Sequence, residues 1–256
     1  ALNRLTAVDY GDGSAEAFVY DAAGNRTRRT ATGGPSPVVT NYTYDAAQQL
    51  VTVSDGSGSH PRQHDAAGNL VNDGQGTSLS WDAYGRLRSV TAAGDVTSYS
   101  YDGDGLRTIA DGAPQLWDRP EDHPRLVETP GEASYVHAGG TVVNEHAGGG
   151  LTWPLGDALG SVRVVTDGSG AVVGSSAYDA FGSVRDASGA RPAFGFAGEL
   201  TGAGGLSFLR ARSYDPSAGR FISADTLQPN AAGTNGWNLY GYANGNPTTF
   251  VDPSGH

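Results

Sequence analysis

Short runs of alternating apolar and polar residues recur along the chain, and they predict β-strands. The runs 38–44, 79–81 and 96–101 place every second side chain on the same face, which is the period of a strand. A Val-rich run before the turn 167–170 and a second Val run after it predict a hairpin. Helical periodicity over a useful length is missing. At spacings of about 8–12 residues, this pattern predicts an all-β chain of roughly 20 short strands.

A seven-residue unit punctuates these runs. It consists of an aromatic residue, Asp, two variable residues, a position that is usually Gly, and two further residues, the last of which is often Leu or Arg. The first five intact copies begin 24, 20, 17 and 20 residues apart, a period that fits two strands and two turns. We expect the aromatic residue to end a strand, Asp to accept backbone N–H groups in the turn, and Gly to supply positive φ. The copies begin at Tyr20, Tyr44, His64, Trp81, Tyr101 and Tyr178.

The amino-acid composition argues against several kinds of functional site. The 256 residues suffice for one large or two ordinary domains, with 39 Gly, 13 Pro and 9% aromatic residues. There is no Cys, which excludes disulfides, thiolate metal sites and a Cys nucleophile. The six His residues show no metal-ligand spacing, and no nucleotide-binding loop is recognisable. We therefore predict neither a metal nor a cofactor.

Charge and hydropathy limit the kinds of partner that this chain can bind. The net charge of −11 disfavours binding to nucleic acid, whose phosphates an acidic surface repels. No apolar run approaches the length of a membrane-spanning helix, and no signal peptide is visible. The chain lacks Met even at position 1, and it starts inside what looks like a truncated repeat, so we expect further repeats upstream.

The repeated unit resembles the YD repeat of RHS proteins, toxin-complex C subunits and teneurins. This resemblance implies a strip of antiparallel β-sheet that spirals into a hollow shell or barrel, closed by an RHS-associated core domain. Residues 1–150 would be the repeats, truncated at the N-terminus. Residues 151–256 would be the core domain with a C-terminal self-cleavage motif. A flat or solenoidal adhesin is the alternative that the repeats leave open.

The C-terminal segment contains the sequence motifs that are most specific for a family. RSYDPSAGRFISAD at 212–225, NLYGYANGNP at 238–247 and DPSGH at 252–256 resemble the RHS-associated core in order and spacing. The resemblance implies an intramolecular aspartyl protease with Arg212, Asp225 and Asp252 as catalytic residues, which cuts after His256. The family usually has Leu where this chain has His256, and often has Pro where Thr226 follows Asp225.

The chemistry is plausible from the residue types alone. Two carboxylates held close together share one proton, so an ionised partner can activate water while the protonated one polarises a carbonyl. A nearby Arg can keep one carboxylate ionised or stabilise an oxyanion. Which Asp is the base stays open. The plainer reading makes each Asp a turn residue, and makes Arg212 a structural ion-pair partner like its neighbours Arg210 and Arg220.

These observations lead to one main hypothesis and one alternative. The main hypothesis is a secreted or cell-surface bacterial shell segment, a single-turnover protease that frees a C-terminal toxin domain of the same precursor. Its other partners would be upstream repeats or further copies that complete the shell. The alternative is a non-catalytic YD-repeat surface or adhesion scaffold, in which the terminal Asp-Pro is only a turn.

Overall fold

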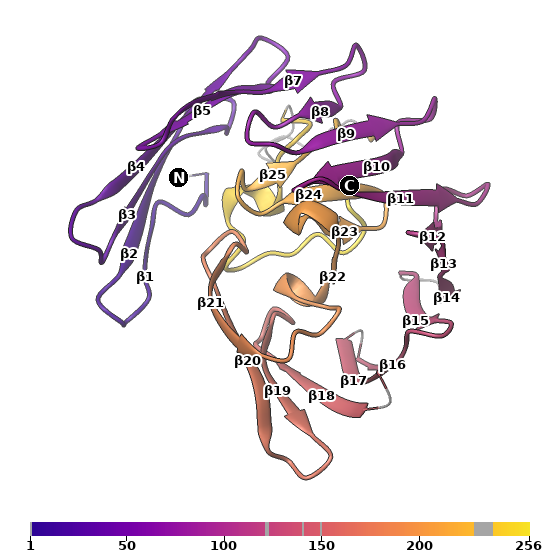
Figure 1. Cartoon of the computed structure of the whole chain (residues 1–256). Coiled ribbons are helices and arrows are strands. Elements are labelled where there is room, and N and C mark those ends of the chain that lie inside the picture. Colours follow the sequence, from indigo (N-terminus) through magenta and orange to yellow (C-terminus); the bar gives the residue numbers. More distant parts are fainter. Residues whose placement is uncertain (1, 121–122, 140, 149, 228–237) are drawn as a thin grey trace.

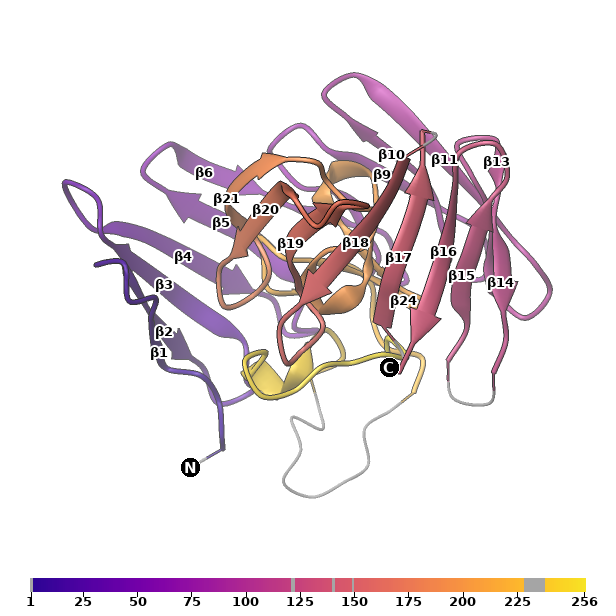
Figure 2. The ribbon, with the colours of Figure 1, turned by 90° about the horizontal axis from the view of Figure 1, so that it is seen from below.

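A computed structural model describes residues 2–120, 123–139, 141–148, 150–227 and 238–256. Antiparallel β-sheet forms a curved strip, and its concave side faces the C-terminal segment of the same chain (Figure 1; Figure 2). Three outer sheets of six, seven and eight strands follow one another along the strip, and a four-stranded sheet lies inside the curve. The predicted all-β architecture is confirmed, with 25 strands in the part described.

The strands of each outer sheet pair in sequence order. The first sheet contains β1 (Ala7–Asp9), β2 (Ala15–Tyr20), β3 (Arg26–Thr32), β4 (Val38–Tyr44), β5 (Leu50–Asp55) and β6 (Gly58–Pro61). The second contains β7 (Gln63–His64), β8 (Leu70–Asn72), β9 (Ser78–Trp81), β10 (Leu87–Ala92), β11 (Asp95–Tyr101), β12 (Arg107–Ala110) and β13 (Ala113–Pro114). The third contains β14 (Leu116–Asp118), β15 (Arg125–Thr129), β16 (Ala133–Ala138), β17 (Thr141–Ala147), β18 (Gly150–Gly156), β19 (Val162–Asp167), β20 (Val172–Tyr178) and β21 (Val184–Gly189).

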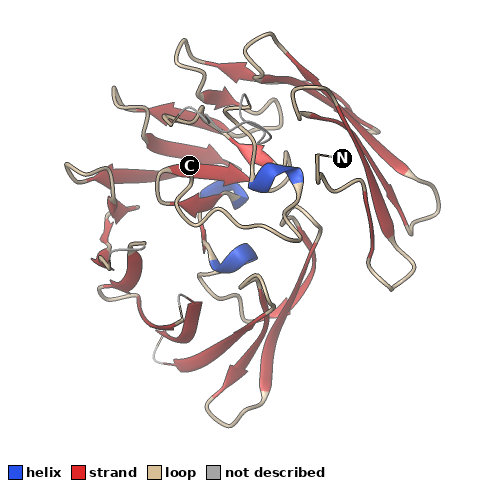
Figure 3. Cartoon of the chain, turned by 180° about the vertical axis from the view of Figure 1, so that it is seen from behind, coloured by secondary structure: helices blue, strands red, loops and turns tan. Residues whose placement is uncertain are grey.

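The described part of the inner segment, which follows β21, has little regular structure. Its short helices lie inside the curve (Figure 3), and within the described ranges no helix is long and apolar enough to cross a membrane. Residue 150 begins β18, which pairs with β17 in one sheet, so the division at this residue stays a prediction. The inner elements are η1 (Phe196–Gly198), β22 (Leu200–Thr201), η2 (Ala203–Gly205), β23 (Ser207–Leu209), β24 (Arg212–Asp215), β25 (Arg220–Phe221) and η3 (Ala243–Gly245).

Each repeated unit forms the same aspartate-capped turn. In the unit at 101–107, the Asp102 carboxylate accepts the N–H of Leu106 at 2.9 Å, and the Asp102 N–H donates to the Leu106 carbonyl at 3.0 Å. Gly105 adopts φ +86°, the left-handed conformation that the sequence pattern predicts. The bond from the N–H of residue i+4 to the carboxylate of Asp i recurs at Asp21, Asp45, Asp65, Asp82, Asp157, Asp167 and Asp179.

Aromatic side chains join each repeat to the one before it. The Tyr101 hydroxyl donates to the Leu87 carbonyl and the Trp81 indole N–H to the Leu70 carbonyl, both at 2.7 Å. The Tyr44 hydroxyl does the same with the Arg26 carbonyl. In each case the acceptor is the seventh residue of the preceding unit. These aromatic residues therefore do more than end a strand, which is all that their position in the sequence predicted.

The concave face of the strip packs against the inner segment. Val90 and Tyr99 of the second sheet share a buried cluster with Leu206 and Ile222. The Leu70 N–H also donates to the Ile222 carbonyl at 2.8 Å. The strip thus folds around an apolar interior supplied by the C-terminal part of the chain.

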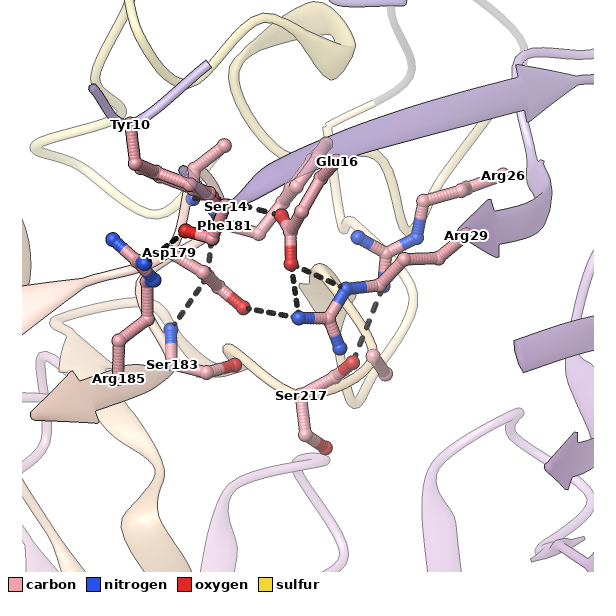
Figure 4. Close-up of polar contacts among 12 residues, drawn as sticks. Tyr10, Ser14, Glu16, Arg26, Arg29, Asp179, Phe181, Ser183, Arg185 and Ser217 are labelled. Carbon is pink, nitrogen blue, oxygen red and sulfur yellow. Dashed lines mark hydrogen bonds and ion pairs between the residues drawn. The ribbon is translucent and has the colours of Figure 1, made fainter. Parts of the chain in front are cut away.

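The two ends of the strip contact each other through side chains (Figure 4). Arg29 forms ion pairs with Glu16 on β2 and with Asp179 in the β20–β21 turn, the latter at 3.3 Å. The Tyr10 hydroxyl donates to Glu16 at 2.9 Å and accepts the Ala180 N–H at 2.8 Å. Burial, reinforced by the Glu16 charge, raises the pKa of Asp179. Among the described residues no strand pairing closes the strip into a barrel. Side-chain contacts bring its ends together, and they also include an ion pair between Arg185 and Asp12 at 2.8 Å and the packing of the Phe18 and Phe181 rings.

We predict that Gly105→Ala lowers the free energy of unfolding by about 1–2 kcal/mol, the cost of an L residue in the left-handed region. An added Cβ would meet no atom within 4 Å, so the effect is conformational rather than steric. Gly103→Ala is the control, because that Gly is equally open and has no positive φ. Urea unfolding measures both; equal midpoints for the two variants would contradict the turn assignment.

We further predict that Tyr101→Phe destabilises the fold by about 1 kcal/mol, because the Leu87 carbonyl loses its donor. Tyr84 occupies a neighbouring turn, is 82% exposed and forms no such bond, so Tyr84→Phe should leave the midpoint of urea unfolding unchanged. A Tyr101→Phe midpoint equal to that of wild type would show that the aromatic bond contributes nothing.

Candidate active site

The end of the chain lies along the turn between β23 and β24 (Figure 1; Figure 2). The Ala211 N–H donates to the Ser254 carbonyl at 3.2 Å. Gly255 has φ +79°, and a Cβ at this position would lie 2.2 Å from the Leu209 carbonyl oxygen. Only Gly therefore allows the tail to approach the turn this closely.

Asp252 holds the tail in the same way that the repeat aspartates hold their turns. One carboxylate oxygen, Oδ1, accepts the N–H groups of Gly255 at 2.9 Å and His256 at 3.2 Å. The other oxygen, Oδ2, faces Arg212. Asp252 can therefore close the turn through Oδ1 and still offer Oδ2 for chemistry, so the structural and the catalytic interpretations are compatible.

Arg212 lies at the centre of the site. Its Nη2 atom is 2.8 Å from Asp225 Oδ2 and 3.9 Å from Asp252 Oδ2. The other guanidinium nitrogens donate to the carbonyls of Leu239, at 2.8 Å, and Gly255. The guanidinium carbon is 3.6 Å from the centre of the Phe221 ring, a cation–π contact.

Burial defines the electrostatics of this group. The side chains of Arg212, Asp225 and Asp252 are 5%, 8% and 12% exposed. Burial lowers the pKa of Arg212 to about 10, and the two carboxylates oppose that shift. The guanidinium therefore stays charged at neutral pH and holds both acidic groups in one partly desolvated site.

The structure thus brings together the three residues selected from the sequence, although their catalytic role stays a prediction. Asp225 is fixed by its N–H, which donates to the Leu239 carbonyl at 2.9 Å, and its Oδ1 lies 3.1 Å from His256 Nδ1. His256, the residue predicted to precede the cut, therefore contacts the candidate pair directly. Among the described side chains, no group of three or more His, Asp and Glu could hold a metal ion.

The neighbouring charged residues have other partners. Arg220 donates to the Gln48 carbonyl at 2.7 Å and stacks on Tyr44 and Tyr240. Asp215 pairs with Arg62 at 3.0 Å. These contacts join the inner segment to the strip, so the plainer structural reading applies to them.

A second charged pair lies beside the tail; sequence reasoning named Arg210 as a possible ion-pair residue but missed its partner, Glu199. Arg210 Nη1 lies 2.9 and 2.8 Å from the two carboxylate oxygens of Glu199, and donates to the Pro253 carbonyl at 2.7 Å. Burial raises the pKa of Glu199 to about 7, with a contribution from Asp252 and against the effect of Arg210. No motif marks Glu199, and the only signal for Arg210 is its place two residues before Arg212.

We predict that Glu199 makes the fold less stable as pH rises from about 4.5 to about 7. Its pKa is higher in the folded chain than in the unfolded one, so folding binds a proton in this window and the gain is lost as pH rises through it. Glu199→Gln should remove up to about 3 kcal/mol of this dependence. Urea unfolding at both ends of the window measures it, with Glu128→Gln, an exposed site, as the control. Equal pH dependence in wild type and Glu199→Gln would refute the assignment.

Comparison with known proteins places these features in a family. A model named RHS Repeat matches residues 81–113, and a model named Teneurin YD-shell matches residues 153–248. The tRNA3(Ser)-specific nuclease WapA of Bacillus spizizenii is 29% identical over 271 residues, which cover 100% of this chain and 11% of that protein. Toxin subunit YenC1 of Yersinia entomophaga is 28% identical over 284 residues, covering 93% of this chain and 28% of that protein.

The fold is similar to that of a solved toxin complex. The crystal structure of TcdB2-TccC3-Cdc42 matches with a TM-score of 0.63 and 19% identity, over 94% of this chain and 15% of the other. At this identity the match concerns the fold alone. The chain spans less than a third of the length of each of these proteins.

Proposed function

Because this chain is an RHS/YD-repeat protein, we propose that it is a shell segment of a toxin carrier that cuts its own chain once, after His256. The observation that carries the proposal is the position of Arg212 Nη2 between Asp225 and Asp252. Segments distant in the sequence supply the two aspartates, and the second of them precedes the proposed cut by four residues.

The reaction is the addition of water to the peptide bond that follows His256. One ionised carboxylate of the pair takes a proton from water, whose oxygen bonds to the His256 carbonyl carbon. The protonated carboxyl group of the pair donates its proton toward the carbonyl oxygen, and Arg212 offsets the negative charge of the pair and of the intermediate. Breakage of the C–N bond, with proton transfer to nitrogen, leaves a carboxylate on His256 and an amine on the next residue. The pair as a unit supplies one base and one acid.

Chain connectivity makes the reaction intramolecular. Asp252 Oδ1 binds the His256 N–H, so the carboxylate lies beside the residue whose carbonyl reacts. Such positioning replaces an encounter in solution and lowers the barrier by several kcal/mol. Because the catalytic Asp belongs to the same tail that is cut, we propose a single turnover.

The proposed cargo is a toxin domain that continues the chain beyond His256. The concave strip supports this, because its inner side holds the C-terminal tail (Figure 1). The names of the relatives, a nuclease and a toxin subunit, also favour a toxic cargo. Upstream repeats or other copies would complete the enclosure, since pairing does not close the described strands. By the same analogy, we propose that the protein acts outside a bacterial cell, as a secreted or surface protein.

The test is a fusion of a reporter domain after His256, weighed by intact mass spectrometry. We predict a single cut after His256, slowed at least about a hundred-fold in Asp225→Asn and in Asp252→Asn. Asp186→Asn, an exposed Asp on β21, should cut at the wild-type rate.

A wild-type fusion that stays intact would reject the protease and favour the scaffold alternative. A cut that survives either Asp substitution would reject the catalytic pair.

A further inference from the structure

Three consecutive residues of the β23–β24 turn bind three consecutive carbonyls of the tail. Arg210 Nη1 donates to the Pro253 carbonyl at 2.7 Å, and the Ala211 N–H to the Ser254 carbonyl at 3.2 Å. The Arg212 Nε–H donates to the Gly255 carbonyl. The tail is thus held by its main chain, one carbonyl for each turn residue.

Arg210 is an unusual choice for its position. Its φ is +62°, in the left-handed region, where a residue other than Gly, Asn or Asp is uncommon. The two-residue turn between Leu209 and Arg212 requires such a conformation, and Gly or Asn would adopt it at lower cost. Strain of this kind at a residue whose side chain makes several polar contacts points to a task for that side chain.

The side chain of Arg210 is immobilised at three points. Besides the Pro253 carbonyl, it contacts both carboxylate oxygens of Glu199, and its Nε donates to the Pro124 carbonyl at 3.0 Å. Glu199 is itself 8% exposed and lies between η1 and β22. Arg210 therefore has little freedom to follow the tail to another position, and it presents one fixed donor to it.

We propose that this turn fixes where the chain is cut, with Arg210 as a positioning residue and Glu199 as its anchor. The inference rests on the proposed function, and adds that the main chain of residues 253–255, rather than the side chain at 256, selects the bond. A shift of the tail by one residue would break the carbonyl contacts together and move Asp252 away from Arg212. Gly255 also fixes the register of the tail, since no other residue fits at this position.

This mechanism accounts for His256 at a position where the resembling family usually has Leu. The His256 side chain is 34% exposed, and its one polar side-chain contact in the described structure is with Asp225. No apolar pocket is required to recognise it. A tail held through its carbonyls accepts different side chains at the residue before the cut.

The reporter fusion tests the proposal through the position of the cut as well as its rate. Arg210→Gln should slow the cut by about ten- to a hundred-fold, the equivalent of one charge-assisted hydrogen bond, and should yield additional products that end one residue away from 256. Glu199→Gln should act in the same direction more weakly, and Arg210→Lys should restore the single product in part. Arg28→Gln, an exposed Arg on β3, is the matched control. His256→Ala should retain the cut position.

A merely structural role would lower stability without changing the masses of the products. A single product at the wild-type rate in Arg210→Gln would overturn the proposal, as would a cut that moves in His256→Ala. Either result leaves the protease itself intact.

Hydrogen exchange of the chain that ends at His256 gives a second reading, independent of cleavage. In wild type the N–H groups of Gly255 and His256 are bonded to Asp252, and they should exchange at least about ten-fold faster in Arg210→Gln. Unchanged exchange would overturn the positioning role. Faster exchange together with an uncut wild-type fusion would reject the protease but keep the contact.

Discussion

The bond from a backbone N–H to the aspartate four residues earlier is the interaction on which the rest of this structure depends. It closes turn after turn along the strip and fixes each of them in the conformation that a left-handed Gly permits. Because the turns are alike, successive hairpins pair in sequence order and form sheets rather than isolated ribbons. The aromatic side chains then join one turn to the preceding unit, so that neighbouring repeats stabilise each other.

The candidate site uses the same device for a second purpose. Asp252 closes the last turn through Oδ1, and the left-handed residue three positions later is Gly255, as in the repeats. Its second oxygen is directed toward Arg212, which also binds Asp225. A turn aspartate becomes a candidate catalytic group because the turn that it closes places its second oxygen beside the buried Arg212 side chain.

Much of the fold could be predicted because its signals are local. Alternation indicated strands, and the Asp and Gly of each unit indicated their turns. The candidate residues Arg212, Asp225 and Asp252 were found because several uncommon sequence motifs occur in the same order as in the family that the chain resembles. No property of a single residue identified them. The aromatic bonds to the preceding repeat, the pair Glu199 and Arg210, and the contact of Asp179 with Arg29 were missed, since each joins residues that are not linked by any local pattern.

By itself, the sequence determined the all-β repeat and the form of its turns. These features depend on conformations and side-chain bonds within a few residues of the chain. Tertiary structure alone decided that the strip curves around its own C-terminal segment and that its ends meet through Glu16, Arg29 and Asp179. It also decided that Arg212 stands between Asp225 and Asp252. Burial and contacts across the chain set these arrangements, and a periodic local pattern carries no information about which distant surfaces will meet.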